Sequence, residues 1–70
     1  MMPLTMASQG EENTIKRIGG KTETRKFLAS LGFVVGAAVT VVSKIGGNVI
    51  VVIKESRVAV SCEMAAKIMI

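Results

Sequence analysis

The chain has 70 residues, half of them hydrophobic, and carries nine Lys or Arg against five Asp or Glu, a formal net charge of +4. A chain of this size makes one domain at most and buries only ~60% of its unfolded surface, which excludes a deep catalytic cleft. It has no histidine to activate a nucleophile and one cysteine, Cys62, so it cannot form an intrachain disulfide. We therefore expect a single domain over residues 1–70 that is not an enzyme.

The first half of the chain is predicted to contain one strand and one helix. Residues 1–12 are an extended entry that ends in a turn, and 14–18 is a strand. Thr22 is placed to cap a helix at about 23–31, because its hydroxyl can accept from a free N–H of the first turn. Gly32 follows the apolar helix face, where a left-handed residue ends a helix.

The second half is predicted to be β structure. After Gly36 a run of β-branched residues indicates a strand at 38–45, and the Gly46-Gly47 pair is a strong tight-turn signal. Residues 49–54 return as the hairpin partner. A third strand at 57–61, a one-turn helix near 62–66 and a closing strand at 67–70 complete the chain.

About five short strands with one short helix favour a mostly β fold, a small SH3-like β-barrel, because closure removes exposed strand edges. A two-layer α+β sandwich is the alternative. The apolar pattern predicts a core of ten residues. These are Ile15, Ile18, Leu28, Leu31, Phe33, Val39, Val41, Ile50, Val58 and Ile68.

Two motifs are excluded by spacing. Gly20-Lys21-Thr22 lies between a strand and a helix, but a phosphate-binding loop needs another glycine five positions earlier, where Ile15 stands. Residues 27–43 carry no charge, yet this stretch is at the short limit of a membrane span and contains two glycines and a switch to β-branched residues. We expect no transmembrane segment.

The residue types also argue against a cofactor. Transition-metal ions prefer imidazole or several converging carboxylates, and one thiol cannot build a thiolate site. We therefore predict no cofactor, no metal ligands, no small-molecule substrate and no catalytic residues. Cys62 is interpreted as a small apolar side chain.

Five of the basic residues fall within eleven positions, between Lys16 and Lys26. Such a cluster indicates an acidic protein, a lipid headgroup or a nucleic acid as partner. Proteins that bind single-stranded nucleic acids interleave aromatic residues for stacking, and only Phe27 and Phe33 are present, which disfavours that option. Our candidates for partner binding are Lys21, Arg25 and Lys26.

The motif Leu31-Gly-Phe-x-x-Gly36 resembles one found in a small family, the ferrous-iron transport accessory protein FeoA. The likeness extends over almost the whole chain. Further matching features are Pro3-Leu4, Gly10-Glu11, Ile15 to Gly20, Arg25, Val39-Thr-Val, the Gly-Gly hairpin, Val58-Ala-Val, Glu63-Met-Ala65 and Ile68-Met-Ile70.

The resemblance implies an SH3-like barrel in the cytoplasm, recruited to the inner face of the membrane by FeoB, the membrane iron transporter with a GTP-binding domain. The implied role is that of an accessory or regulatory interaction module for ferrous iron uptake. The alternative from the residues alone is a small basic barrel that binds RNA or another anionic partner through Lys16, Arg17 and Lys21. Transition-metal binding belongs to the family-level description, whereas the ligand types here predict no dedicated site.

Overall fold

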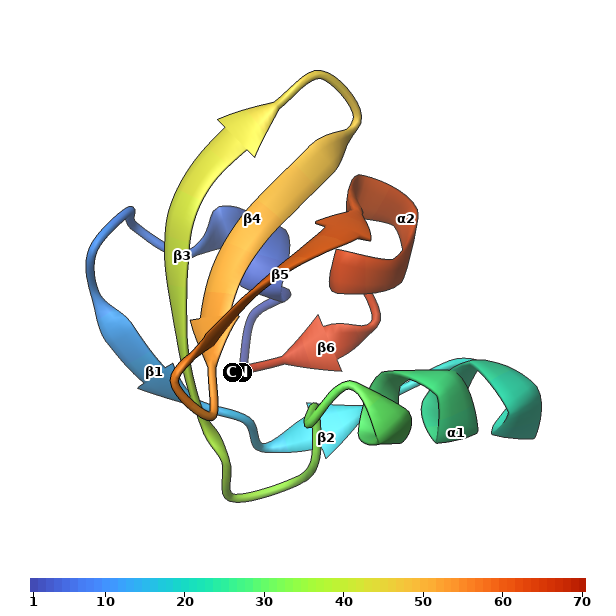
Figure 1. Cartoon of the computed structure of the whole chain (residues 1–70). Coiled ribbons are helices and arrows are strands. Elements are labelled where there is room, and N and C mark those ends of the chain that lie inside the picture. The colour runs from blue at the N-terminus through green and yellow to red at the C-terminus, as the bar shows by residue number, and fades with distance from the viewer.

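The computed structural model describes all 70 residues and shows two antiparallel sheets with short helices around them (Figure 1). One sheet has the order β1-β3-β4-β5, and the other pairs β2 with β6. The mostly β class predicted from the sequence is confirmed. The bounds are η1 Leu4–Met6, β1 Glu12–Thr14, β2 Arg17–Ile18, α1 Thr22–Ser30, β3 Ala38–Ile45, β4 Asn48–Ile53, β5 Ser56–Ser61, α2 Cys62–Ala65 and β6 Ile68–Met69.

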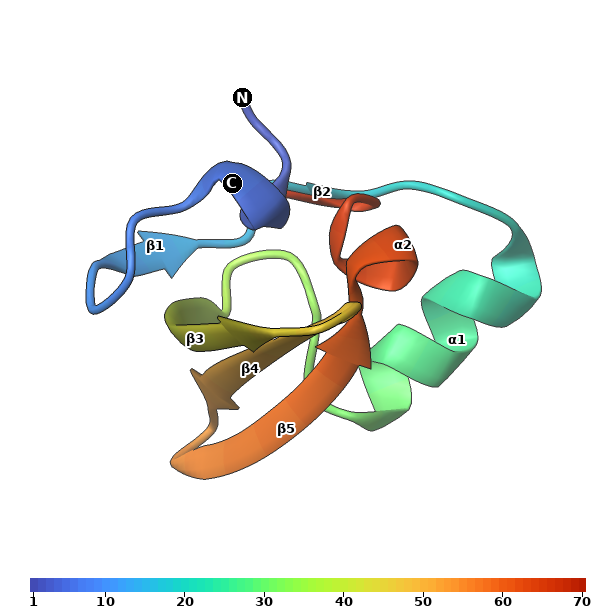
Figure 2. The same cartoon turned by 90° about the horizontal axis from the view of Figure 1, so that it is seen from above.

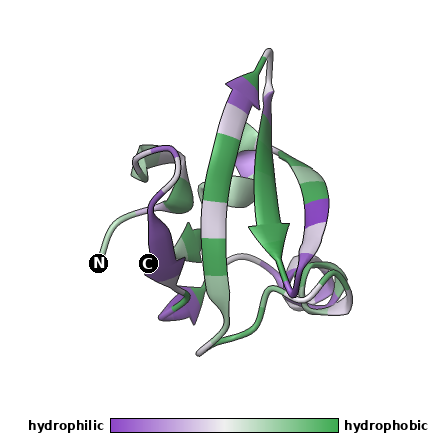
Figure 3. Ribbon diagram, turned by 60° about the vertical axis from the view of Figure 1, so that its left-hand side comes forward, coloured by the Kyte–Doolittle hydropathy of each residue, from purple (hydrophilic) through white to green (hydrophobic).

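The centre of the molecule is the meander of β3, β4 and β5, which curves around the core (Figure 2). β4 is apolar along nearly its whole length, whereas β3 alternates (Figure 3). Val49, Val51 and Ile53 of β4 face inward and are at most 1% exposed. Their pairing with β3 shifts register between Val41 and Ser43, which marks a bulge. Such a bulge bends the strand and helps the sheet to curl.

The strand predicted at 14–18 is broken in the structure, so there are six strands instead of five. Ile15 exchanges backbone hydrogen bonds with the segment before β3, accepting from Gly36 N–H at 2.8 Å and donating to Ala37 C=O at 2.9 Å. The next residue, Lys16, donates to Met69 C=O at 2.8 Å. The chain therefore leaves one sheet for the other between β1 and β2, as strands do at barrel corners.

Helix α1 ends on a motif that fixes it to the core. Gly32 has φ +105° and donates to Ala29 C=O at 3.0 Å, and Phe33 donates to Leu28 C=O at 3.0 Å. These two bonds form a Schellman motif, in which the N–H of the residue after the glycine donates to the carbonyl of the third residue from the C-terminal end of the helix. Leu28 and Phe33 are both fully buried, so the end of the helix and the core are built by the same pair.

The predicted cap at Thr22 is wrong. Thr22 is the first helical residue, Lys21 occupies the N-cap position without a side-chain hydrogen bond, and the Thr22 hydroxyl accepts from the Arg25 guanidinium at 3.4 Å. By contrast, Ser61 caps α2, since its hydroxyl accepts from Met64 N–H at 3.2 Å.

Two tight hairpins connect the meander. Ile45 pairs with Asn48 around Gly46-Gly47, where only Gly46 has a positive φ, +58°. The second hairpin encloses Lys54 and Glu55, with φ of +50° and +64°. Positive φ at both central positions is typical of a type I′ turn, which normally carries Asn and Gly. The second turn is therefore strained.

Six of the ten predicted core residues are buried: Ile15, Leu28, Phe33, Val39, Val41 and Ile68. Three others are half-buried and pack against that core: Ile18, Leu31 and Val58. The placement of Ile50 is wrong, because β4 buries Val49 and Val51 and therefore turns Ile50 to the opposite face. Leu4 of η1 and Val60 of β5 belong to the core although the pattern did not select them.

The two ends of the chain lie side by side. Met2 and Ile70 exchange two backbone hydrogen bonds, of 3.0 and 2.8 Å, and Pro3 forms a bridge with Met69. In this chain no helix has both the length and the apolar character that crossing a membrane requires.

Candidate functional site

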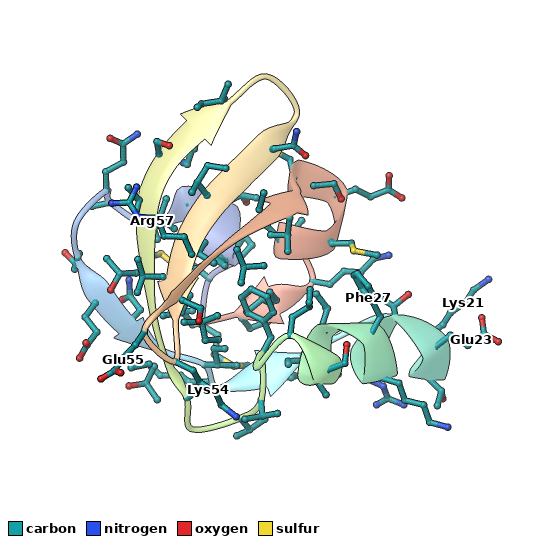
Figure 4. The ribbon with its side chains drawn as sticks, in the orientation of Figure 1. Lys21, Glu23, Phe27, Lys54, Glu55 and Arg57 are labelled. Carbon is teal, nitrogen blue, oxygen red and sulfur yellow. The ribbon has the colours of Figure 1, made fainter.

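The predicted partner-binding residues lie on α1 and at its N-cap, at the periphery of the molecule (Figure 1). Leu28 is the only residue of this nine-residue helix that is buried. Lys21, Arg25 and Lys26 are all exposed, and Figure 4 shows Lys21 at the outermost tip of the helix. We call these three residues the α1 basic surface. A helix attached by its C-terminal end leaves the other turns free to meet a partner.

The positive charge of this surface extends beyond α1. Lys16 and Arg17 are exposed on the preceding segment, and the Lys67 side chain approaches the backbone of Gly20. Glu23 is the acidic residue of the first helical turn. Among these cations only Arg25 makes a side-chain hydrogen bond, to Thr22. Side chains with so few internal contacts are available to an anionic partner.

Helix α1 also carries an exposed aromatic side chain. Phe27 directly precedes the buried Leu28 but is itself 49% exposed. Figure 4 shows it on the side of α1 that faces α2 in that view. The helical period explains the difference, since Leu28 is the residue that points to the core and its neighbour is rotated away by about 100°. An aromatic residue of this kind is enriched in protein interfaces.

The structure contains no enclosed binding or catalytic site. The surface has no pocket, and nowhere do three or more of the acidic, cysteine and histidine side chains come together as a metal-binding group. Cys62 is half-buried at the start of α2 with a free thiol. What the molecule presents to other molecules is therefore its outer surface.

The predicted turn residues lie apart from the α1 basic surface. Gly36, with φ +91°, stands in the connection to β3, and Gly46-Gly47 is the tip of the β3–β4 hairpin. An added Cβ at Gly32 would meet the Lys54 side chain, whose Cδ would lie 3.3 Å away. These glycines shape the backbone and contribute no functional group.

Comparison with known proteins places this arrangement in a family. The model of the FeoA domain matches residues 2–70. The chain belongs to the FeoA domain family. It is 34% identical over 70 residues to the putative Fe(2+) transport protein A of Methanocaldococcus jannaschii, a match that covers 100% of this chain and 85% of that protein. FeoA proteins are non-enzymatic accessory proteins associated with ferrous iron transport, and the chain is accordingly not an enzyme.

Solved FeoA structures share the fold. A crystal structure of an iron uptake regulatory protein (FeoA) superposes with a TM-score of 0.89 at 26% identity, over 97% of this chain and 90% of that one. The solution structure of iron(II) transport protein A from Clostridium thermocellum gives 0.90 at 24% identity, over 97% of this chain and 43% of that one. A manganese-dependent transcriptional repressor gives 0.85 at 22% identity, over 94% of this chain and 38% of that one, a likeness of fold alone. The SH3-like FeoA fold implied by the sequence is confirmed.

Proposed function

We propose that this FeoA-domain protein is a cytoplasmic accessory module that binds a FeoB-like iron transporter through the α1 basic surface and supports ferrous iron uptake. The observation that carries the proposal is the exposure of Lys21, Arg25 and Lys26 on a helix that is anchored by a single buried residue. Family membership supplies the ferrous iron transport context.

The surface suits docking on an acidic protein for two physical reasons. The cations are exposed and close together, so their combined potential steers an acidic partner and raises the association rate. Phe27 adds exposed apolar area on a different face of the same helix, since residues one or two apart on a helix do not face each other, and aromatic residues often supply the anchor of an interface. Neither reason involves a bound metal, so the proposed role is protein recognition.

The experiment is a charge reversal. Arg25→Glu combined with Lys26→Glu is expected to abolish co-purification with the cytoplasmic domain of the transporter while the melting temperature stays close to that of the unmodified chain. Substitutions at exposed positions usually change the free energy of unfolding by about 0.5 kcal/mol or less. Both side chains are exposed.

A matched control reverses charge elsewhere. Lys44→Glu alters an exposed cation on β3, outside both α1 and the β5 edge, and should leave co-purification unchanged if α1 is the contact. Full binding by the α1 double variant would place the transporter contact elsewhere, with the Gly46-Gly47 hairpin or the C-terminal strand as the next surfaces. Retention of RNA by the unmodified chain, weakening steeply with salt, would instead support a nucleic-acid partner.

A further inference from the structure

The two edges of the four-stranded sheet are protected unequally. β1 is an edge of three residues that carries Glu12 and is preceded by Glu11, and short, charged edges resist pairing with other chains. β5, the other edge, has six residues, no proline and a single charge, Arg57. Figure 2 shows no strand alongside β5 on the side away from β4.

The register shows which backbone groups of β5 are free. Cys62 donates to Gly47 C=O at 2.8 Å, and Ile53 pairs with Ser56 at the hairpin. Because hydrogen-bonded residues alternate in an antiparallel pair, Ser56, Val58 and Val60 bond to β4. The N–H and C=O groups of Arg57 and Ala59 therefore point away from the sheet. Both residues are exposed.

The side chains along β5 also lack neighbours on both faces of the sheet. On the inner face Val60 is 4% exposed, whereas Val58 is only half-buried. On the outer face Arg57 is exposed, and its cross-strand neighbour on β4 is Val52, which offers it no charge. An additional strand beside β5 would cover Val58 and could place a carboxylate next to Arg57.

We propose that the free edge of β5 binds an extended segment of a partner protein as an added strand, with β-branched side chains on the inner face and an acidic side chain beside Arg57. Backbone bonds to Arg57 and Ala59 supply affinity, and the alternating side chains supply specificity. Assigning the segment to the transporter rests on the proposed function, whereas the strand addition itself does not.

The first test uses a synthetic peptide with the pattern Thr-Val-Glu-Val-Thr-Val, end-capped, titrated into isotopically labelled protein. We expect the amide signals of Arg57 and Ala59 to shift and to gain protection from hydrogen exchange. A peptide with Lys in place of Glu should bind about fivefold more weakly, because exposed charge pairs contribute modestly. The Arg57→Glu variant should invert this preference.

The second test blocks the edge without breaking the sheet. In Ala59→Pro the lost N–H is one that points away from β4, so the β4–β5 bonds survive, but an added strand loses a donor. Peptide binding should fall about tenfold or more. Ala59→Val keeps the N–H, enlarges the side chain and should bind as the unmodified chain does. Circular dichroism and the melting temperature of both variants confirm that the fold is retained.

The outcomes separate the two proposals. The double reversal at Arg25 and Lys26 should leave peptide binding intact, so a failed α1 contact does not affect this test. Unchanged binding by folded Ala59→Pro, or peptide-induced shifts confined to other strands, would overturn the strand addition. A concentration-dependent dimer that Ala59→Pro dissociates would show that a second copy of the chain binds this edge. That result would overturn the proposal that a partner's segment binds there.

Discussion

Helix α1 and strand β4 differ in how many of their residues they bury. The strand buries three of its six residues, Val49, Val51 and Ile53, between two neighbouring strands. The helix buries one of nine, Leu28. The fold is therefore held by the curved sheet, while most of α1 is dispensable for stability and available for recognition. In so small a domain, a basic helix that contributes little to the core is the simplest place for a binding surface.

The sharpest test of this comparison is Leu28→Ala, since Leu28 is the one residue that joins α1 to the core. A fully buried leucine replaced by alanine costs roughly 2–5 kcal/mol of the free energy of unfolding. Because small domains have total stabilities near the low end of ~5–15 kcal/mol, we expect a large loss of melting temperature. Chemical denaturation measures it.

Leu31→Ala is the matched variant. The sequence predicted that Leu31 points into the core, but it is half-buried beyond the last helical turn. We expect its loss to cost clearly less than that of Leu28, about 1–2 kcal/mol. Equal costs for the two variants would show that α1 is held by more than its single buried anchor.

Gly32→Ala tests the junction between the helix and the sheet. Gly32 has φ +105°, and an added Cβ would approach the Lys54 side chain at 3.3 Å. The backbone strain should cost about 1–3 kcal/mol. Gly47→Ala is the control, because Gly47 has no positive φ and nothing within 4 Å of an added Cβ. Similar melting temperatures for the two variants would contradict the Schellman ending described for α1.

The smallest expected effect is a gain in stability at the strained hairpin of the sheet. Glu55 has φ +64°, which glycine adopts without steric cost. Glu55→Gly should raise the free energy of unfolding by about 0.5–1 kcal/mol, whereas Glu55→Ala keeps the Cβ and should not. Thermal denaturation of the pair separates backbone strain from the loss of charge. A stabilising alanine would attribute the gain to the carboxylate instead.

Local patterns in the sequence predicted most elements, and the errors have physical causes. The apolar run at 49–53 has no polar residue to set the phase of its alternation, so Ile50 was assigned to the core although the pairing turns it outward. The break between β1 and β2 depends on hydrogen bonds from Ile15 and Lys16 to segments far along the chain. No local signal carries that information.

The sequence predicted which charged residues form the candidate site but not what surrounds them. The sequence identified Arg25 and Lys26 as exposed cations, and the structure places them on the peripheral helix. It did not reveal that Phe27 is exposed on the same helix, because one apolar residue can belong to either side of a short helix. The free edge of β5 depends on the strand order, which only the folded chain shows.

The measurement that tests the account most directly is a titration of isotopically labelled protein with the cytoplasmic domain of the transporter, followed by amide signals. The account predicts that signals from Lys21 to Phe27 broaden or shift first and that those of Val49 to Ile53 do not. In the double variant Arg25→Glu with Lys26→Glu, the α1 signals should neither broaden nor shift. Perturbation centred on the Gly46-Gly47 hairpin or on β6, with α1 silent, would contradict it.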